Sequence, residues 1–528
     1  MSASLSCVGL DFSWPDGRTL FHGLDLTVGP GRTGLIGLNG SGKSTLLRLL
    51  TGELTPEAGS VKVTGSLGHL PQNLTLDAEL PVAEALGIAG TRTALHAIER
   101  GEATPENFAA VGDDWDVEER ARAGLDRLGL TGVSLEHRVG QLSGGQGMLL
   151  GLAGLLLRRP DVLLLDEPTN NLDRDARHYL HQAVTAWKGP LLLVSHDREL
   201  LDLVDQIADL HEGRIHSYGG TFSDYQAAQA VEQEAAERML RAAESDVRRQ
   251  QRELVETQVR LAHRKRYGQK MYDNKREPKI VMNQRKAQAQ VSSGRLRGQQ
   301  QDRVAAARER LAEAESSVRA DPEILVDLKA TEVPAGRTVV VLTQVRPQHT
   351  GEEVAIDLSV RGPERIALLG PNGSGKTTLL RTLAGELPPL AGEVFRAVPL
   401  RFLPQRLDLL DEGLSVAENV ALFAPGATDN QVRARLARFL FRGGRADQLV
   451  GSLSGGERFR ATLAALMLAE PAPQLLLLDE PTNNLDLASV RQLASALAAF
   501  QGALVVASHD QPFLDSIGIT RRLELNRP

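Results

Sequence analysis

The stretch GLNGSGKSTLLRLL at residues 37–50 decides the fold, and a near-copy, GPNGSGKTTLLRTL, stands at residues 370–383. Both carry the GxxxxGK[ST] pattern, in which glycines let backbone N–H groups crowd around phosphates. An apolar run typical of a strand precedes each copy, and a run typical of a helix follows it. That context confirms a phosphate-binding loop, so the sequence predicts two nucleotide-binding α/β modules.

Further landmarks follow each loop in the same order and at nearly the same spacing. A lone glutamine stands 29 residues after the loop lysine, and a short turn reads LSGGQ at 142–146 and LSGGE at 453–457. The run LLLDEPTNNLD also occurs twice, and the histidine of an SHD triplet follows its first aspartate by 30 residues in both copies. The chain is therefore two copies of one module of roughly 200 residues, with a segment between them.

The loop and the acidic runs predict distinct roles toward a nucleotide. The loop lysines, Lys43 and Lys376, are expected to contact the β- and γ-phosphates. The next residues, Ser44 and Thr377, are expected to ligate Mg²⁺.

The apolar runs VLLLDE and LLLLDE read as buried parallel strands that end in two acids. Ligands bind at the carboxyl ends of strands in open α/β sheets, so Asp166 and Asp479 are expected to hold Mg²⁺. The next residues, Glu167 and Glu480, are placed to take a proton from an attacking water.

The LSGG turns predict a second anion-binding element. Ser143 and Ser454 precede apolar helices and are suited to cap them, while the glycines after them expose N–H groups at the helix start.

Composition excludes several classes of protein. With 528 residues, 42% hydrophobic and 24% charged, the chain has material for two to four packed domains. Its one cysteine, Cys7, excludes an internal disulfide framework and any site built from several thiolates. The longest apolar runs reach about ten residues, short of the roughly 20 that span a membrane. We therefore expect a cytoplasmic protein with no membrane domain.

The segment at 229–322 differs from the modules on either side and predicts a helical hairpin. Leu240, Val247, Leu254 and Leu261 repeat every seven residues, as do Val304, Leu311 and Val318, while Pro278 interrupts the pattern. The predicted domains are thus 1–228, the hairpin at 229–322, and 323–528.

The outer part of that hairpin, residues 260–297, is strongly basic. It carries 12 Lys or Arg and two acids, a net charge of +10 in a chain whose total is −7. Such a density of uncompensated charge favours a polyanion as partner, and structured RNA is preferred over DNA or an acidic protein. The candidate RNA-binding residues are Arg264, Lys265, Arg266, Lys270, Lys275, Arg276, Lys279, Arg285, Lys286, Arg295 and Arg297.

The loop, the single glutamine, LSGG[QE], LLLDEP and SHD, in that order, resemble the ATP-binding cassette (ABC) superfamily. The resemblance implies two tandem P-loop ABC ATPase domains of α/β fold that close head to tail within one monomeric chain. Each ATP, with Mg²⁺, would lie between one cassette's loop and the other cassette's LSGG turn, and the SHD histidines would contact the γ-phosphate.

The resemblance assigns residues position by position. The implied catalytic residues are Glu167, Glu480, His196 and His509. The implied ATP-binding residues are Trp14, Gly37, Asn39, Gly40, Gly42, Lys43, Ser44, Thr45, Gly370, Asn372, Gly373, Gly375, Lys376, Thr377, Thr378, Ser143, Gly144, Gly145, Ser454, Gly455 and Gly456. The implied Mg²⁺ ligands are Ser44, Gln72, Asp166, Thr377, Gln405 and Asp479.

The two copies depart from each other at two places. The superfamily stacks adenine on an aromatic residue before the loop; Trp14 suits the first copy, whereas the second reads LTQVRPQHTG, where Arg346 is the expected substitute. The first signature continues as GMLL, where the second has RFR. We therefore expect two ATP sites that are not equivalent, with every catalytic position present in both.

Two cassettes on one chain, DEPTNNLD in both, and a charged helical linker look like the ABC-F family. About 22 extra residues in the first cassette, within 90–135, stand where that family carries its arm. The resemblance implies a partner, the ribosome, bound at the tRNA exit site, with the linker tip reaching P-site tRNA and the peptidyl-transferase centre.

Several functions stay open on the sequence. Protection of the ribosome from antibiotics is favoured over general regulation of translation or rescue of stalled ribosomes. The ATPase subunit of a membrane transporter and a DNA-maintenance ATPase are alternatives of other classes, and the basic hairpin between two continuous cassettes disfavours both.

Overall fold

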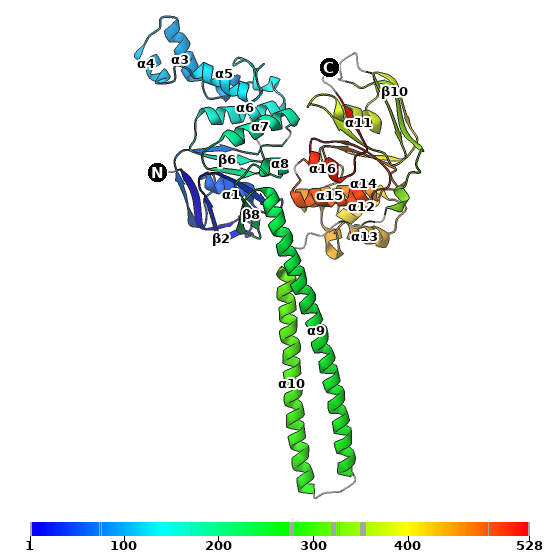
Figure 1. Cartoon of the computed structure of the whole chain (residues 1–528). Helices are drawn as coiled ribbons and strands as arrows, with labels where there is room; N and C mark the ends of the chain where they lie inside the picture. Colours follow the sequence, from blue (N-terminus) through cyan, green and yellow to red (C-terminus); the bar gives the residue numbers. More distant parts are fainter. Residues whose placement is uncertain are drawn as a thin grey trace. The chain divides into compact units, whose positions relative to one another are not determined.

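The computed structural model describes residues 3–525 except 73, 75, 76, 171, 274–278, 318–323, 325, 327, 349–354 and 484. Its contacts divide the chain into two compact units. One unit comprises Met1–Phe222 and Pro322–Pro528, and the other is Ser223–Asp321. Figure 1 shows two α/β regions in the first unit and two long helices in the second.

The first cassette is built on a six-stranded sheet of order β5-β6-β7-β3-β8-β9, parallel except for β8–β9. Every residue of β6 and β7 is buried, as their continuous apolar sequences predict. The strands are β3 (Arg32–Gly37), β5 (Leu67–Leu70), β6 (Val162–Asp166), β7 (Leu191–Val194), β8 (Gln206–His211) and β9 (Arg214–Gly219). A second, antiparallel sheet holds β1 (Ser4–Ser13), β2 (Thr19–Val28) and β4 (Ala58–Thr64).

The helices of this cassette position its motifs around the parallel sheet. Leucines on the helix after the loop pack with β6 and β7 in one core, so the loop and the acidic strand end are held together. The helices are α1 (Lys43–Leu50), α2 (Val82–Ala85), α6 (Gly144–Leu157), α7 (Arg174–Ala186) and α8 (Arg198–Leu201), with a 3₁₀ turn at Val139–Gln141.

The predicted arm region of the first cassette is helical. It holds α3 (Ala89–Glu99), α4 (Pro105–Val111) and α5 (Val117–Arg127). Isolated β-bridges, Pro81 with Arg138 and Ser415 with Leu449, bracket this region and its counterpart. The bracketed interval is longer in the first cassette, in line with the extra residues read from the sequence.

The second cassette repeats the plan with a five-stranded parallel sheet of order β14-β15-β16-β12-β17. Its strands are β12 (Arg365–Leu369), β14 (Leu400–Leu403), β15 (Leu475–Asp479), β16 (Ala503–Ala507) and β17 (Arg521–Glu524). The antiparallel sheet holds β10 (Thr338–Arg346), β11 (Ile356–Arg361) and β13 (Ala391–Arg396).

The helices of the second cassette follow the same order as those of the first. They are α11 (Lys376–Ala384), α12 (Val416–Phe423), α13 (Asp429–Arg438), α14 (Gly455–Met467), α15 (Leu487–Ala499) and α16 (Gln511–Ser516). Short 3₁₀ turns lie at Lys329–Thr331, Gly443–Asp447 and Val450–Ser452.

The segment between the cassettes forms the predicted helical hairpin. Helix α9 (Phe222–Asp273) and helix α10 (Lys279–Ser317) lie side by side in Figure 1. The first helix begins seven residues before the predicted start at 229, directly after the preceding cassette's last strand and a short turn. Pro278 and its neighbours, where the break is predicted, lie outside the described residues.

The hairpin is packed along only part of its length. Buried or half-buried side chains recur at alternating spacings of four and three, the pattern of a coiled-coil seam. On α9 they are Ala236, Leu240, Ala243, Val247, Gln250, Leu254, Thr257 and Leu261, and on α10 they are Gln300, Val304, Ala307, Leu311 and Ala314. Beyond this seam, every described side chain at 262–270 and 284–297 is exposed.

Polar groups lie within and beside the seam. Asp246 of α9 forms an ion pair with Arg310 of α10, with 3.0 Å between Oδ2 and Nη2. The predicted repeat residue Val318 lies outside the described residues.

Candidate ATP sites

The two phosphate-binding loops adopt the same conformation. Gly42 and Gly375 precede α1 and α11 with φ of 103° and 90°, a left-handed geometry that favours glycine. A Cβ on Gly42 would lie 2.7 Å from the ring of Phe21, so the site also requires the absence of a side chain. The loop therefore needs glycine here for both backbone and space.

Both loop lysines donate hydrogen bonds to backbone carbonyls of their own loops. Lys43 Nζ donates to the carbonyls of Gly37 and Leu38 at 2.8 and 3.1 Å. Lys376 Nζ donates to the carbonyl of Gly370 at 2.7 Å. Burial lowers the pKa of both lysines. A buried ammonium held over an array of backbone N–H groups is suited to an anionic ligand.

The two acids at the end of β6 and Asp479 at the end of β15 are buried, and the side chain of Glu480 is 12% exposed. Glu167 and Glu480 have φ of 47° and 44°, a conformation that is strained for a residue with a side chain. Burial raises the pKa of both glutamates to about 7, against the charge of the loop lysine. A buried carboxyl with a raised pKa, placed on a strained turn, is suited to accept a proton.

Several oxygens of these acids lack partners of their own. Asp166 Oδ1, Glu167 Oε1, Asp479 Oδ2 and Glu480 Oε1 are buried and make no hydrogen bond. Burying an unpaired hydrogen-bond acceptor is costly, so these oxygens are suited to bind a cation or the hydrogen-bond donors of a ligand. Within the described ranges no three acidic, histidine or cysteine side chains form a metal cage by themselves. This donor set fits Mg²⁺, which is usually held by one or two carboxylates of the protein and takes its remaining ligands from phosphate oxygens and water.

The SHD histidines lie against the glutamates. His196 Nε2 is 3.2 Å from Glu167 Oε1, and His509 Nε2 is 3.4 Å from Glu480 Oε1. Burial lowers the pKa of His196 to about 3 and that of His509 to about 4. Both imidazoles are therefore neutral at pH 7, so each contact joins a neutral ring to a carboxyl rather than two full charges.

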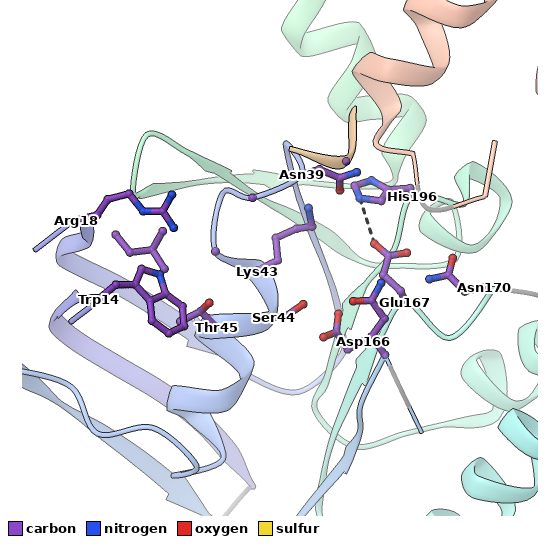
Figure 2. Close-up of a pocket in the computed structure, with 15 residues that line it drawn as sticks. Trp14, Arg18, Asn39, Lys43, Ser44, Thr45, Asp166, Glu167, Asn170 and His196 are labelled. Carbon is purple, nitrogen blue, oxygen red and sulfur yellow. Dashed lines mark ion pairs between the residues drawn. The ribbon is translucent and has the colours of Figure 1, made fainter. Parts of the chain in front are cut away.

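A cavity of about 380 Å³ surrounds the first loop. Figure 2 shows Trp14 and Arg18 on one side, Lys43 and Ser44 in the middle, and the acids with His196 on the other. The lining also includes Asn39, Gly40, Gly42, Thr45, Gln72 and Asn170. Gly455 of the second cassette lines it too, so a residue of the second LSGG turn stands at the first loop.

Trp14 has no counterpart at Arg346. In both antiparallel sheets a bulged residue donates its N–H to an aspartate, Gly9 to Asp25 and Gln344 to Asp357. If Gly9 is aligned with Gln344, Asp11 aligns with Arg346. Trp14 then aligns with residue 349, which lies outside the described residues. Arg346 pairs with Ala391 as Asp11 does with Ala58. The structure thus places Arg346 within the sheet ladder and gives no support to its predicted adenine contact.

The LSGG turns cap helices as predicted. The Ser143 and Ser454 hydroxyls accept from the N–H groups of Gln146 and Glu457, whose side chains accept from the serine N–H groups in return. Gly144 and Gly145 open α6, and Gly455 and Gly456 open α14. Thr45 and Thr378 lie in the first turns of α1 and α11, while Gln72 and Gln405 lie on exposed turns between strand and helix.

Two contacts join the cassettes that the sequence analysis missed. Asp486 Oδ2 accepts from the backbone N–H of Asn39 at 2.7 Å, and Asp173 Oδ2 accepts from that of Asn372 at 3.1 Å. Each aspartate also caps its own helix, α15 or α7, through Oδ1. The repeated NNLD ending was a signal for them, because an aspartate before a helix is a strong cap.

The basic residues of the hairpin are described in part. Arg264, Lys265, Arg266, Lys270, Arg295 and Arg297 are exposed. Lys275 and Arg276, and the side chains of Lys279, Arg285 and Lys286, lie outside the described residues.

The site combines three features: a phosphate-binding loop that opens a helix, a buried acid pair beside it, and a serine–glycine turn from the other module. Together they define a tandem ATP-binding cassette protein. A profile of the ABC transporter family matches residues 21–170 and 354–483, the two cassettes and not the hairpin. The relatives narrow that class, and the chain belongs to the ABC-F family. Cassettes of this family bind ATP.

Three relatives span almost all of this chain. The tylosin resistance ATP-binding protein TlrC of Streptomyces fradiae is 35% identical over 97% of this chain and 95% of its own. The probable ATP-binding protein YheS of Escherichia coli K12 is 34% identical over 94% and 75%. The energy-dependent translational throttle protein EttA of Mycobacterium tuberculosis is 31% identical over 94% and 87%.

Solved structures share the tandem fold. A structure of RNase-L Inhibitor superimposes with a TM-score of 0.57 at 20% identity, covering 94% of this chain and 84% of its own. An archaeal ribosome recycling factor, aABCE1, gives a TM-score of 0.55 at 18% identity, covering 98% and 87%. Among the described residues, no helix has the length and apolarity to cross a membrane.

Proposed function

We propose that this protein is an ATPase that binds the ribosome when its cassettes are closed on ATP. It would act through the basic end of the hairpin on P-site tRNA and the peptidyl-transferase centre. The observation that carries the proposal is the hairpin that the chain inserts between its two ATP-binding cassettes: beyond the seam, its described basic side chains are exposed. Exposed arginine and lysine at that density fit a phosphate backbone.

The cassettes supply the switch. With ATP and Mg²⁺ bound, Ser44, Gln72 and Asp166 would hold the ion at the first site, and Thr377, Gln405 and Asp479 at the second. Mg²⁺ neutralises charge on the phosphates. Glu167 and Glu480 would each take the proton of an attacking water, and neutral His196 and His509 would orient toward the γ-phosphate.

Closure explains how ATP would control docking. The LSGG turn of one cassette adds N–H groups at a helix start to the anion bound by the other. The two aspartate contacts, Asp486 to Asn39 and Asp173 to Asn372, already lie across that boundary. ATP would therefore stabilise the closed form and hydrolysis would release it. A cytoplasmic location follows for a ribosome-bound protein.

The role in translation is proposed to be protection of the ribosome from an antibiotic. The similarity to TlrC, a tylosin resistance protein, extends over nearly the whole of both chains and favours this role. The similarity to EttA, a translational throttle protein, favours regulation of translation instead, at lower identity. The resemblance to the ABC-F family also bears on the role. In that family a short arm goes with antibiotic protection, and the arm of this chain, with about 22 extra residues, is short.

The first experiment is co-sedimentation with purified ribosomes. The Glu167→Gln/Glu480→Gln double variant, mixed with ribosomes at about 150 mM salt, is expected to pellet with ATP and to stay in the supernatant without it. A matched variant that also replaces the exposed Arg264, Lys265 and Arg266 by Ala is expected to lose pelleting while it keeps ATP binding. Failure of the double variant to pellet with ATP bound would overturn the ribosomal target.

A translation assay then separates the two roles. If the protein protects, addition of wild-type protein to a translation mixture inhibited by tylosin or a related drug is expected to restore synthesis. If it regulates, the protein is expected to alter synthesis in the absence of drug and to leave the inhibited reaction unchanged.

A further inference from the structure

The LSGG turn of the second cassette belongs to the first ATP site, and an ion pair holds the helix that it opens. Gly455 of this turn lines the cavity around the first loop. Arg458, in the first turn of α14, donates its backbone N–H to the carbonyl of Ser454 at 2.8 Å. Its guanidinium Nη1 donates to Glu412 Oε1 at 2.7 Å. The LSGG turn is therefore one helical turn away from a fixed charged contact.

The partner of Arg458 lies on a backbone turn that is itself well held. Glu412 stands between β14 and α12, and its carbonyl accepts from the N–H of Gly451 at 3.1 Å. The side chain of Asn419, in α12, accepts from the N–H of Asp411 at 2.8 Å and donates to its carbonyl at 2.9 Å. Because this turn is tied to its surroundings on both sides, the ion pair joins α14 to a fixed point.

The first cassette has the same turn without the acid. The N–H of Gly140 donates to the carbonyl of Ala78 at 2.9 Å, which matches the bond from Gly451 to Glu412. Gly140 and Gly451 each lie two residues before the leucine of their LSGG turn. Ala78, which is exposed, therefore takes the place of Glu412.

The helix that follows the LSGG turn of the first cassette lacks the cation too. Counted from the LSGG serine, Gly147 of α6 stands at the position of Arg458. Its N–H donates to the carbonyl of Ser143 at 2.8 Å, so the helical turn itself is the same. A Cβ added to Gly147 would meet no atom within 4 Å. Both partners of the ion pair are thus missing together, although there is room for the side chain.

A second contact of α14 is replaced in the same way. The guanidinium of Arg460 lies 5.5 Å from the centre of the Phe441 ring. By the same count their counterparts are Leu149 and Leu130, which are 3% and 2% exposed. A cation over a ring has a preferred geometry, whereas apolar packing is non-directional. The start of α14 is therefore fixed by directional contacts at two positions where α6 has a glycine and a leucine.

We propose that the Arg458–Glu412 ion pair positions the LSGG turn that serves the first ATP site, and that the turn serving the second site lacks this support. Arg458 is a positioning residue, because it acts through the helix start that carries Gly455. A binding element that is fixed before the ligand arrives loses less conformational freedom on binding. The first site is therefore expected to close at a lower ATP concentration than the second. The inference rests on the proposed ATP-dependent closure of the cassettes and is independent of the ribosomal target.

Single-site variants of the full-length chain test this difference. Glu480→Gln leaves the first site as the active one, and Glu167→Gln leaves the second. The Glu412 side chain is 66% exposed, so the pair is expected to change an equilibrium constant by a small factor. In the Glu480→Gln background, Arg458→Gln is expected to raise KM for ATP about twofold to fivefold and to leave kcat within about twofold. In the Glu167→Gln background, the same substitution is expected to leave KM within about twofold.

A reversed pair separates the effect of the contact from that of either side chain. Glu412→Arg alone and Arg458→Glu alone each place like charges together, so each is expected to raise the first-site KM at least as much as Arg458→Gln does. The double variant brings opposite charges together again and is expected to return KM to within about twofold of the starting value. Loss of a side chain that matters only for folding would not be repaired by this exchange.

The first cassette allows the converse experiment. Ala78→Glu together with Gly147→Arg places the same two charges beside the LSGG turn that serves the second site. In the Glu167→Gln background, this double variant is expected to lower KM for ATP about twofold to fivefold. Ala78→Glu with Gly147→Gln is the matched control, because it fills the same space without the cation, and it is expected to leave KM unchanged.

Further controls identify which idea fails. Arg433→Gln removes another ion pair of the same cassette, that with Asp447, and is expected to leave both sites unchanged. If Arg458→Gln fails to fold, Glu412→Gln removes the same pair from its exposed side and is expected to give the same first-site change. Equal KM changes in both backgrounds, no change at the first site, or no recovery in the reversed pair overturns the inference alone. A wild-type chain that hydrolyses no ATP overturns the proposed ATPase and the inference with it.

Discussion

The two cassettes have the same motifs but different surroundings for them. In the first, Trp14 lines the nucleotide cavity, and the loop lysine Lys43 donates to the carbonyls of Gly37 and Leu38 in its own loop. In the second, the loop lysine contacts the SHD histidine, with 3.0 Å between Lys376 Nζ and His509 Nε2. Identical motifs therefore do not make identical sites, because residues outside the shared motifs differ between the two cassettes.

The largest expected effect comes from the two glutamates. Glu167→Gln and Glu480→Gln together are expected to reduce ATP turnover at least a hundredfold while ATP binding persists, since removing a general base typically costs that much. Steady-state phosphate release measures turnover, and filter binding of labelled ATP measures affinity. Each single variant is expected to retain the turnover of the other site, so unequal residual rates rank the two sites. Wild-type turnover in the double variant would contradict the assignment of the base.

The cross-cassette aspartates are expected to have the next largest effect. Asp486→Asn keeps an oxygen to cap α15 but loses the acceptor for the Asn39 N–H, and Asp173→Asn does the same toward Asn372. A charge-assisted hydrogen bond contributes about 1.5–3 kcal/mol, which predicts roughly a tenfold to hundredfold weaker closure on ATP. Distance measurements between labelled cassettes in the hydrolysis-deficient background report closure. Unchanged closure in both variants would show that these contacts are incidental.

Trp14→Ala is expected to weaken the first site alone. Stacking of a base on an aromatic side chain contributes about 1–3 kcal/mol, so KM for ATP in the Glu480→Gln background is expected to rise roughly fivefold to a hundredfold. In the Glu167→Gln background, KM is expected to stay within twofold. Trp14→Phe serves as the matched control and is expected to retain most of the affinity. Equal KM changes in both backgrounds would contradict the assignment of Trp14 to one site.

The smallest effect concerns Cys7, whose place in the second cassette is taken by the buried Leu342. Burial raises the pKa of the thiol to about 11 from its usual 9. The folded protein is therefore expected to react with a thiol reagent at pH 8 far more slowly than the urea-unfolded chain. Because the pKa is raised in the folded state, this group contributes stability below pH 9 that is lost as pH rises toward 11. Fast labelling of the folded protein would contradict its burial.

Most of the fold was predictable because the motifs fix both elements and order. The loop sequences define α1 and α11, and the apolar runs define β6 and β15, without reference to anything distant. The adenine contact expected of Arg346 stays a prediction; bulges in the two antiparallel sheets shift the count, so that Arg346 corresponds to Asp11 rather than to Trp14. Local spacing cannot show such a shift.

Contacts between segments that are distant in the sequence were the other feature that the sequence could not predict. The seam includes Gln250 and Thr257 at positions where a leucine repeat predicts apolar residues only. Asp173 and Asp486 stand before helices as ordinary caps, and the sequence does not show that they also accept from Asn372 and Asn39 of the opposite cassette. The roles of individual residues toward ATP stay predictions, because they depend on a ligand that the sequence specifies only through the family.

The point at which the hairpin's seam ends has a mechanical consequence. Two helices locked together by side chains bend as one beam, whereas two unlocked helices bend separately and far more easily. The locked part extends to Leu261 and Gln300, so a rotation at the base passes along it with little loss. Past that point the described side chains at 262–270 and 284–297 are exposed, so these stretches lack the stiffening that the seam gives. The seam thus makes the inner part of the hairpin a stiff shaft, and the exposed stretches beyond it present their side chains to a partner.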